Sequence, residues 1–253
     1  MKKVKSLLVV WKNSVNNLYY HVGTLTYNGE NYSFQYTHFS DSPRTVKEAQ
    51  KEGYQLHPAF PELKKKYESP DLFPAFDRRI PDKSRVGFQH ILNELQLSSY
   101  ADRMDILRET RGALAGDPYT FEEPLRLEDN KINSRFYING MRHQDLPKTL
   151  FENLTIGETL AVEIAEDNPV DKYAVNIFTS QGLLLGFVPG IYAQAIYSLL
   201  KQGKEIDLRI KALKPNYAPQ WWVQVQLETF LDLSKDDREQ KKIFESFLFQ
   251  DTA

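Results

Sequence analysis

Alternating apolar and polar residues at the start of the chain predict an antiparallel sheet. Residues 4–12, 19–27 and 32–36 each have the pattern of a strand, because they are rich in β-branched and aromatic side chains. Asn28 and Gly29 lie between the second and third segments, and both residue types tolerate the positive φ of a tight hairpin turn. The pattern therefore predicts a β meander.

The pattern then changes to short helices among prolines. Residues 41–83 are interrupted by prolines, so we expect irregular backbone with short helices around residues 45–52 and 62–67. A helix capped by Ser84 should follow, because apolar residues recur at helical spacing at Phe88, Leu92 and Leu95. One more helix is predicted at residues 102–111.

A polar stretch at residues 123–133 predicts a domain boundary. Short strands follow it, at residues 134–141, 158–165, 173–179, 183–188, 205–213 and 220–228. One helix, at residues 190–202, interrupts them, and this combination favours a small β-barrel or roll. The predicted fold class is α+β, with an antiparallel β meander or roll and helices in residues 1–125 and a small β-barrel with one helix in residues 132–232.

Residues 233–253 form a predicted third segment, an amphipathic helix. Ser234 can cap it, and Phe244 and Phe247 belong to an apolar stripe at helical spacing. A short terminal helix with such a stripe has to dock, either on its own domain or in the groove of a partner. Phe244 and Phe247 are therefore candidate partner-binding residues, with both destinations open.

Composition and charge limit the function classes. The chain has no cysteine, which excludes disulfides, thiol nucleophiles and thiolate metal sites. No apolar run approaches the ~20 residues that span a bilayer, so we expect a cytoplasmic protein with no membrane partner. The net charge is +1 for residues 1–131 and −2 for residues 132–232. Neither domain has the basic excess of a protein that lies along duplex DNA, so any nucleic acid must use a small local site.

No catalytic constellation stands out in the sequence. The five histidines are scattered without metal-ligand spacing, and the segment from Gly112 to Gly116 lacks the Lys-Ser/Thr of a phosphate loop. No motif places two carboxylates in one cleft. We therefore expect a protein that is not an enzyme and needs no metal or cofactor.

Two motifs in the second half are the most specific feature of the chain. Asn168-Pro169-Val170-Asp171 fills a polar turn between apolar strands, and Leu185-Gly186-Phe187-Val188-Pro189 follows. With Asn139-Gly140-Met141-Arg142-His143, these motifs resemble the HIRAN domain over about residues 132–230. The resemblance implies a small OB- or SH3-like barrel that binds single-stranded 3′ ends of DNA.

The HIRAN resemblance also implies roles for individual residues. Arg142 takes the place of an arginine that grips the DNA end, and His143 takes the place of a stacking tyrosine. Asp171 stands for a carboxylate that accepts the terminal hydroxyl. Phe187 offers a face for an unpaired base. Asn168, in the same turn as Asp171, completes the candidate DNA-binding set.

Two positions depart from the DNA-binding members, and two simpler interpretations stay open. Val170 replaces a tyrosine, which removes a base stack worth roughly 1–3 kcal/mol, and Pro189 lies where a basic residue is common. The turn at Asn168 is also explained by its structural role alone, because Asn before Pro initiates turns. Arg142 and His143 are also explained as a solvated pair on a strand.

The first half resembles a different family. Leu8-Val9-Val10-Trp11, His21-Val22-Gly23-Thr24-Leu25 and Leu72-Phe73-Pro74-Ala75-Phe76 follow the order of the N-terminal subdomain of HipA-type serine/threonine kinases. No kinase catalytic loop follows them. The resemblance therefore implies a regulatory subunit similar to the small HipS-like antitoxin subunit of tripartite systems. It also implies a HipA-like kinase and a HipB-like DNA-binding protein as partners, with Phe73 and Phe76 as candidate contacts.

Two functional hypotheses follow from these resemblances. In the first, the chain is a non-catalytic, antitoxin-like subunit that restrains a HipA-like kinase, and its HIRAN-like module tethers nucleic acid or the complex. In the second, the chain binds single-stranded 3′ DNA ends independently of any kinase.

Overall fold

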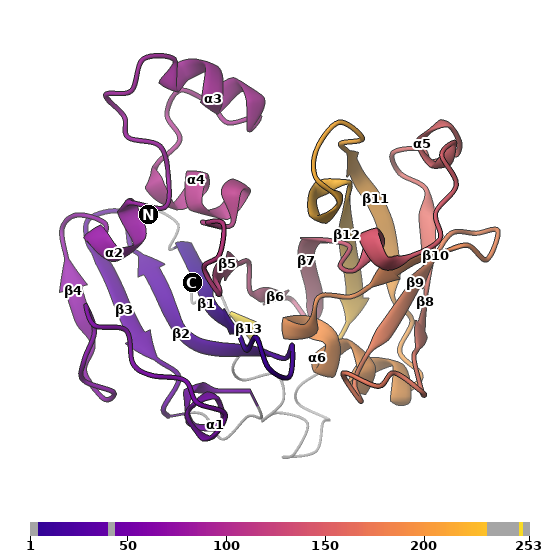
Figure 1. Ribbon diagram of the computed structural model, residues 1–253, viewed down its shortest axis with the longest axis horizontal. Coiled ribbons are helices and arrows are strands. Elements are labelled where there is room, and N and C mark those ends of the chain that lie inside the picture. The colour runs from indigo at the N-terminus through magenta and orange to yellow at the C-terminus, as the bar shows by residue number, and fades with distance from the viewer. Residues whose placement is uncertain (1–4, 40–43, 232–247, 250–253) are drawn as a thin grey trace. The chain divides into compact units, whose positions relative to one another are not determined.

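The computed structural model divides the chain between Pro124 and Leu125 into two units, drawn as a ribbon in Figure 1. Residues 5–39, 44–231 and 248–249 are described. Both units combine a sheet with short helices, which confirms the predicted α+β class. In these described stretches, no helix has the length and apolar character needed to cross a membrane.

The first unit is built on a five-stranded antiparallel sheet in the order β4-β3-β2-β1-β5. The side-chain oxygen of Asn28 accepts hydrogen bonds from the amides of Glu30 and Asn31 at 2.9 and 2.8 Å, which closes the predicted hairpin between β2 and β3. The meander is therefore confirmed, and β5 extends it beside β1. The strands are β1 (Lys5–Lys12), β2 (Tyr19–Tyr27), β3 (Tyr32–Tyr36), β4 (Tyr67–Ser69) and β5 (Tyr119–Glu122).

The described helices of the first unit are short. α4 begins at a capping box, because the side chains of Asp102 and Asp105 each accept the backbone amide of the other at 3.1 Å. Ser84 does not cap α3 as predicted: Gly87, with φ of 85°, precedes that helix, and Ser84 binds the carboxylate of Asp82 in a turn. The helices are α1 (Val46–Lys51), α2 (Pro74–Asp77), α3 (Phe88–Glu94) and α4 (Arg103–Thr110).

The helix predicted at residues 62–67 is wrong. This segment is a turn that leads into β4, where Tyr67 pairs with Phe34 of β3. Its local propensity yields to strand pairing and to burial, because the Tyr67 ring also packs on Phe60 with centroids 5.1 Å apart.

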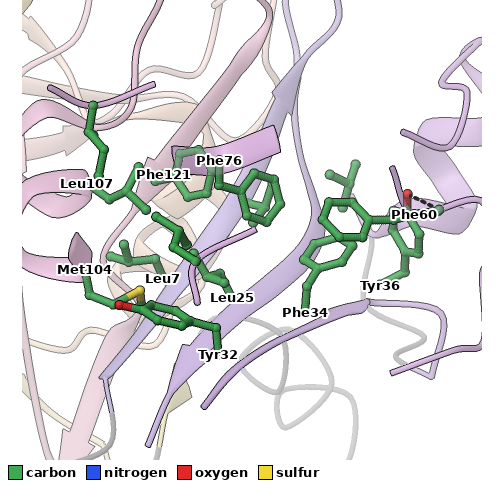
Figure 2. Close-up of a cluster of buried hydrophobic side chains, with 14 of the residues drawn as sticks. Leu7, Leu25, Tyr32, Phe34, Tyr36, Phe60, Phe76, Met104, Leu107 and Phe121 are labelled. Atoms are coloured by element: carbon green, nitrogen blue, oxygen red, sulfur yellow. Dashed lines mark hydrogen bonds between the residues drawn. The ribbon is translucent and has the colours of Figure 1, made fainter. Parts of the chain in front are cut away.

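Aromatic rings fill the core of the first unit (Figure 2). The ring centroid of Phe60 lies 4.4 Å from that of Phe34 and 5.1 Å from that of Phe76, which in turn lies 5.1 Å from Phe121. The hydroxyl of Tyr36 donates to the carbonyl oxygen of Phe60 at 2.9 Å, and burial raises the pKa of Tyr36 to about 12. Phe76, only 4% exposed, is thus part of this core.

The second unit curls one sheet into a half-barrel, with strands in the order β10-β9-β8-β11-β12-β7-β6-β13. The helix α6 (Gly190–Lys201) packs on it, and its buried Tyr192 lies 5.5 Å from the Phe136 ring. The predicted helix and strands of this half occur at nearly the expected positions. The strands are β6 (Leu125–Glu128), β7 (Lys131–Tyr137), β8 (Thr159–Ile164), β9 (Val175–Phe178), β10 (Leu184–Phe187), β11 (Asp207–Leu213), β12 (Val223–Phe230) and β13 (Leu248–Phe249).

The edges of the second unit differ from the prediction. The polar stretch expected to separate the domains contains β6, which pairs with β7. Most of the predicted terminal helix, including Phe244 and Phe247, lies outside the described residues. Leu248 and Phe249 form β13, parallel to β6, so these two positions are extended rather than helical.

Gly186 lets β10 approach the segment that follows β7. Asn139 and Phe187 exchange two backbone hydrogen bonds of 2.9 and 2.8 Å beside it. A Cβ on Gly186 would lie 2.3 Å from the carbonyl oxygen of Asn139 and 3.0 Å from a methyl of Ile138, at a φ of 152°. Only glycine fits there, which explains the glycine of the Leu-Gly-Phe-Val-Pro motif.

We predict that Gly186→Ala lowers the free energy of unfolding of the second unit by about 2–4 kcal/mol, because backbone atoms cannot move aside as a flexible side chain can. Thermal and urea denaturation measure the loss. Gly182→Ala is the matched control: its φ is also positive, at 82°, but no atom lies within 4 Å of the added Cβ. That control should lose only about 1 kcal/mol. Equal losses for the two variants would show that the close approach at Gly186 is unimportant.

Candidate nucleic-acid interface

Arg142 and His143 lie on a helical turn, not on the strand that the sequence predicts. β7 ends at Tyr137, and Gly140, with φ of 76°, turns the backbone into the 3-10 helix η1 (Met141–His143). Left-handed backbone cannot continue a strand, which is why the predicted strand stops short. Met141 is buried, whereas Arg142 and His143 are exposed. Neither exposed side chain forms a hydrogen bond or ion pair with the residues that the structure describes.

Phe187 lies directly beside η1. Its backbone pairs with Asn139, and a Cβ built on Gly140 would lie 3.0 Å from the Phe187 ring. The ring is half-buried, so part of it faces solvent next to the turn that carries Arg142 and His143. The structure thus brings together three of the five candidate DNA-binding residues.

The turn at Asn168 is held by its own side chains. The side-chain oxygen of Asn168 accepts the amides of Val170 and Asp171, both at 3.0 Å, and the carboxylate of Asp171 accepts the amide of Tyr173 at 2.9 Å. Such bonds explain why Asn and Asp occupy these positions. The structural interpretation of Asn168 is therefore sufficient, and a DNA contact through Asp171 stays a proposal.

Backbone pairing links this turn to Phe187. The turn ends where β9 begins, and the amide of Val188 donates to the carbonyl of Val175 at 2.9 Å. Asn176 is the partner of Phe187 in the ladder. The turn thus leads into the start of β9, which pairs with the end of β10, and the end of β10 pairs in turn with the segment before η1. At the tip of the turn, Val170 is 53% exposed.

The loop from Lys214 to Trp222 is a neighbouring feature whose role the sequence interpretation missed, and only its residues 220–222 fall within a predicted strand. It contains the 3-10 helix η2 (Pro219–Trp221), which contacts η1. The Lys214 ammonium donates to the Tyr137 hydroxyl at 2.9 Å, and the Tyr137 and Trp221 rings meet edge to face at 4.9 Å. The signal that could have revealed it is compositional: two tryptophans and a tyrosine near a lysine, with prolines that disfavour a strand.

The candidate partner-binding residues of the first unit are not a free surface. Phe73 is half-buried and its ring lies 5.1 Å from Phe60, while Phe76 is in the core. The prediction that Phe76 contacts a partner is therefore not carried further, because its ring already has apolar neighbours on several sides. In the part of the chain that is described, no group of three or more His, Asp or Glu side chains could hold a metal ion.

Comparison with known proteins identifies the second unit. Residues 132–233 match the family model of the HIRAN domain. No family match supports the resemblance of the first half to HipA-type kinases. A search of curated proteins finds no match.

Two crystal structures align with part of the chain. One, of a protein from Lactobacillus plantarum, is 18% identical over 40% of this chain and 99% of its own, with a TM-score of 0.35. The other, the HIRAN domain of human HLTF, is 12% identical over 48% of this chain and 93% of its own, with a TM-score of 0.34. The family match spans β7 through β12, including η1 and the turn at Asn168. Residues 132–233 of this chain are therefore a HIRAN domain.

Proposed function

We propose that this protein binds single-stranded 3′ ends of DNA through its HIRAN domain, and that it acts by binding rather than by catalysis. The observation that carries the proposal is that η1, which bears the exposed Arg142 and His143, contacts β10, whose half-buried Phe187 ring lies at Gly140. A guanidinium next to aromatic faces suits an unpaired nucleotide, because it offers a phosphate contact and base stacking in one place.

The charge of the domain favours an end over a continuous duplex. Residues 132–232 carry a net charge of −2, so they lack the basic stripe that duplex phosphates require. A terminal nucleotide needs only a few contacts. Arg142 would bind its phosphate, His143 and Phe187 would face its base, and Asp171 would accept its 3′ hydroxyl.

We predict that Arg142→Ala weakens binding of a fluorescein-labelled single-stranded oligonucleotide by about tenfold or more, because a charge-assisted hydrogen bond is worth roughly 1.5–3 kcal/mol. Fluorescence anisotropy at low salt measures the affinity. Arg85→Ala, which removes an exposed arginine of the first unit, should leave it within about twofold. Absence of binding by the unaltered protein at low salt would eliminate the proposed function.

The role of Asp171 predicts discrimination between chemical ends. The unaltered protein should prefer a 3′ hydroxyl over a 3′ phosphate by about tenfold, because a carboxylate accepts a hydrogen bond from a hydroxyl and repels a phosphate. Asp171→Asn keeps an oxygen that can accept the Tyr173 amide, so the turn should persist while the preference falls below about threefold. Competition between oligonucleotides that differ only in this end group measures it. An unchanged preference in the variant would remove Asp171 from the site.

A second role is proposed for the first unit, namely restraint of a HipA-like kinase. Its support is the order of motifs in the sequence and the exposure of two large apolar residues around α3: Val86 is 98% exposed and Tyr100 is 94% exposed. Single exposed apolar side chains are common at protein surfaces, so the order of motifs carries this role, and Val86 and Tyr100 supply positions at which to test it. A bound lobe restrains a kinase only if it binds the inactive state better than the active one.

We expect the chain to co-purify with a HipA-like kinase that lacks its own N-terminal subdomain and to lower its autophosphorylation. Val86→Asp combined with Tyr100→Asp should weaken co-purification at least tenfold, since both residues lie at the surface. Val15→Asp, at another position that is 89% exposed, is the control. Unchanged autophosphorylation at saturating amounts of this protein would rule out the restraining role.

A further inference from the structure

We propose that the Lys214–Trp222 loop is a second stacking surface, which holds the bases that precede the terminal nucleotide. This inference rests on the proposed binding of single-stranded DNA ends. It lengthens the stretch of DNA that the protein contacts, because unpaired bases stack on the aromatic side chains of this loop. The occupant is therefore the next few nucleotides of the same strand.

Hydrogen bonds across the Lys214–Trp222 loop hold its backbone and one of its indoles in place. The amide of Lys214 donates to the carbonyl of Trp222 at 2.8 Å, and the amide of Tyr217 donates to the carbonyl of Lys214 at 3.1 Å. The indole N–H of Trp222 donates to the carbonyl of Tyr217 at 2.8 Å, which fixes the largest side chain across the loop. Aromatic side chains that are already ordered lose little entropy when a base stacks on them.

The aromatic side chains of the loop are partly exposed. Tyr217 is 52% exposed, and Trp221 and Trp222 are only half-buried. The Trp221 ring packs edge to face on Tyr137, and this contact explains why Trp221 is partly buried. The Trp222 ring meets Phe151 edge to face, with centroids 5.6 Å apart. Packing accounts less for Tyr217, because its ring stacks on no other aromatic ring among residues 44–231 and about half of the residue is exposed.

The stretch of chain that contains the loop carries an excess of positive charge. Between Asp207 and Glu228 the chain contains Arg209, Lys211 and Lys214 and no carboxylate. Arg209 forms an ion pair with Asp207 at 2.9 Å, which leaves the two lysines as the cations of this stretch. The Lys214 ammonium lies 5.7 Å from the Tyr217 ring centroid, so a positive charge accompanies the aromatic surface. Phosphates between stacked bases need such a cation.

The loop adjoins the proposed end site. The amide of Ile138 donates to the carbonyl of Val223 at 3.0 Å, directly after the loop, and Asn139 pairs with Phe187 one residue later. η1, which carries Arg142, also contacts η2 within the loop. η1 and the loop are therefore close enough for one strand of DNA that ends at Arg142 to reach both.

The test is a length series of oligothymidylates with free 3′ hydroxyls, from two to ten nucleotides, titrated against the full chain. The affinity of the unaltered protein should rise with length. Tyr217→Ala and Trp222→Ala should each remove about tenfold of the affinity for the longer oligonucleotides. Both should keep the affinity for the dinucleotide, whereas Arg142→Ala should lower the affinity at every length.

Two controls separate the possible failures. Phe230→Ala removes an aromatic ring of the same unit that is 68% exposed and should have no effect at any length. Tyr217→Ala alters an exposed residue, so this variant should fold like the unaltered protein. Circular dichroism checks that it does. If Tyr217→Ala and Trp222→Ala bind every length like the unaltered protein, the second surface is wrong while end binding stands. If the unaltered protein binds no oligonucleotide, both proposals fall.

Discussion

The pairing of Asn139 with Phe187 is the constraint on which the arrangement of the second unit depends. These residues belong to segments that are not neighbours in the sheet order, and two backbone hydrogen bonds hold them together. The pairing is possible because Gly186 has no Cβ to meet the Asn139 carbonyl. It places the η1 turn, the end of β10 and, through β9, the turn at Asn168 next to one another. A small sheet with little net charge can in this way gather a few recognition groups at one place.

The first unit is held together by different chemistry. Its aromatic core surrounds a buried arginine, Arg79, whose guanidinium donates to the Gly112 carbonyl at 3.1 Å and to Asp117 at 2.6 Å. The same guanidinium lies 5.6 Å from the Tyr119 ring centroid. Removing either polar partner of a buried charge costs more than the bond is worth, because the charge stays desolvated. Arg79 therefore ties the segments that carry Gly112 and Asp117 to the core through polar contacts as well as packing.

Periodicity alone predicted most strands of both units, because their alternation reflects burial on one face of a sheet. The HIRAN motifs predicted the presence of that domain, which the family model matches at residues 132–233. The failures have specific physical causes. Tyr67 lies in a strand because it pairs with β3 and packs on Phe60. Arg142 lies in a helical turn instead of the predicted strand because Gly140 adopts a left-handed φ. Both depend on contacts or dihedral angles that a single sequence does not display. The role of the Lys214–Trp222 loop could not be predicted, because it depends on neighbours, Tyr137 and η1, that lie about 75 residues earlier.

The strand β6 decides where an expression fragment of the second unit should begin. It lies before the residues that match the HIRAN family, yet it pairs with β7 on one side and with β13 on the other. A fragment trimmed to the matched residues would strip β7 of that neighbour and leave its amides and carbonyls open to a second molecule, the usual origin of edge-to-edge aggregation. An expression fragment that starts at Leu125 would keep that side of the sheet covered.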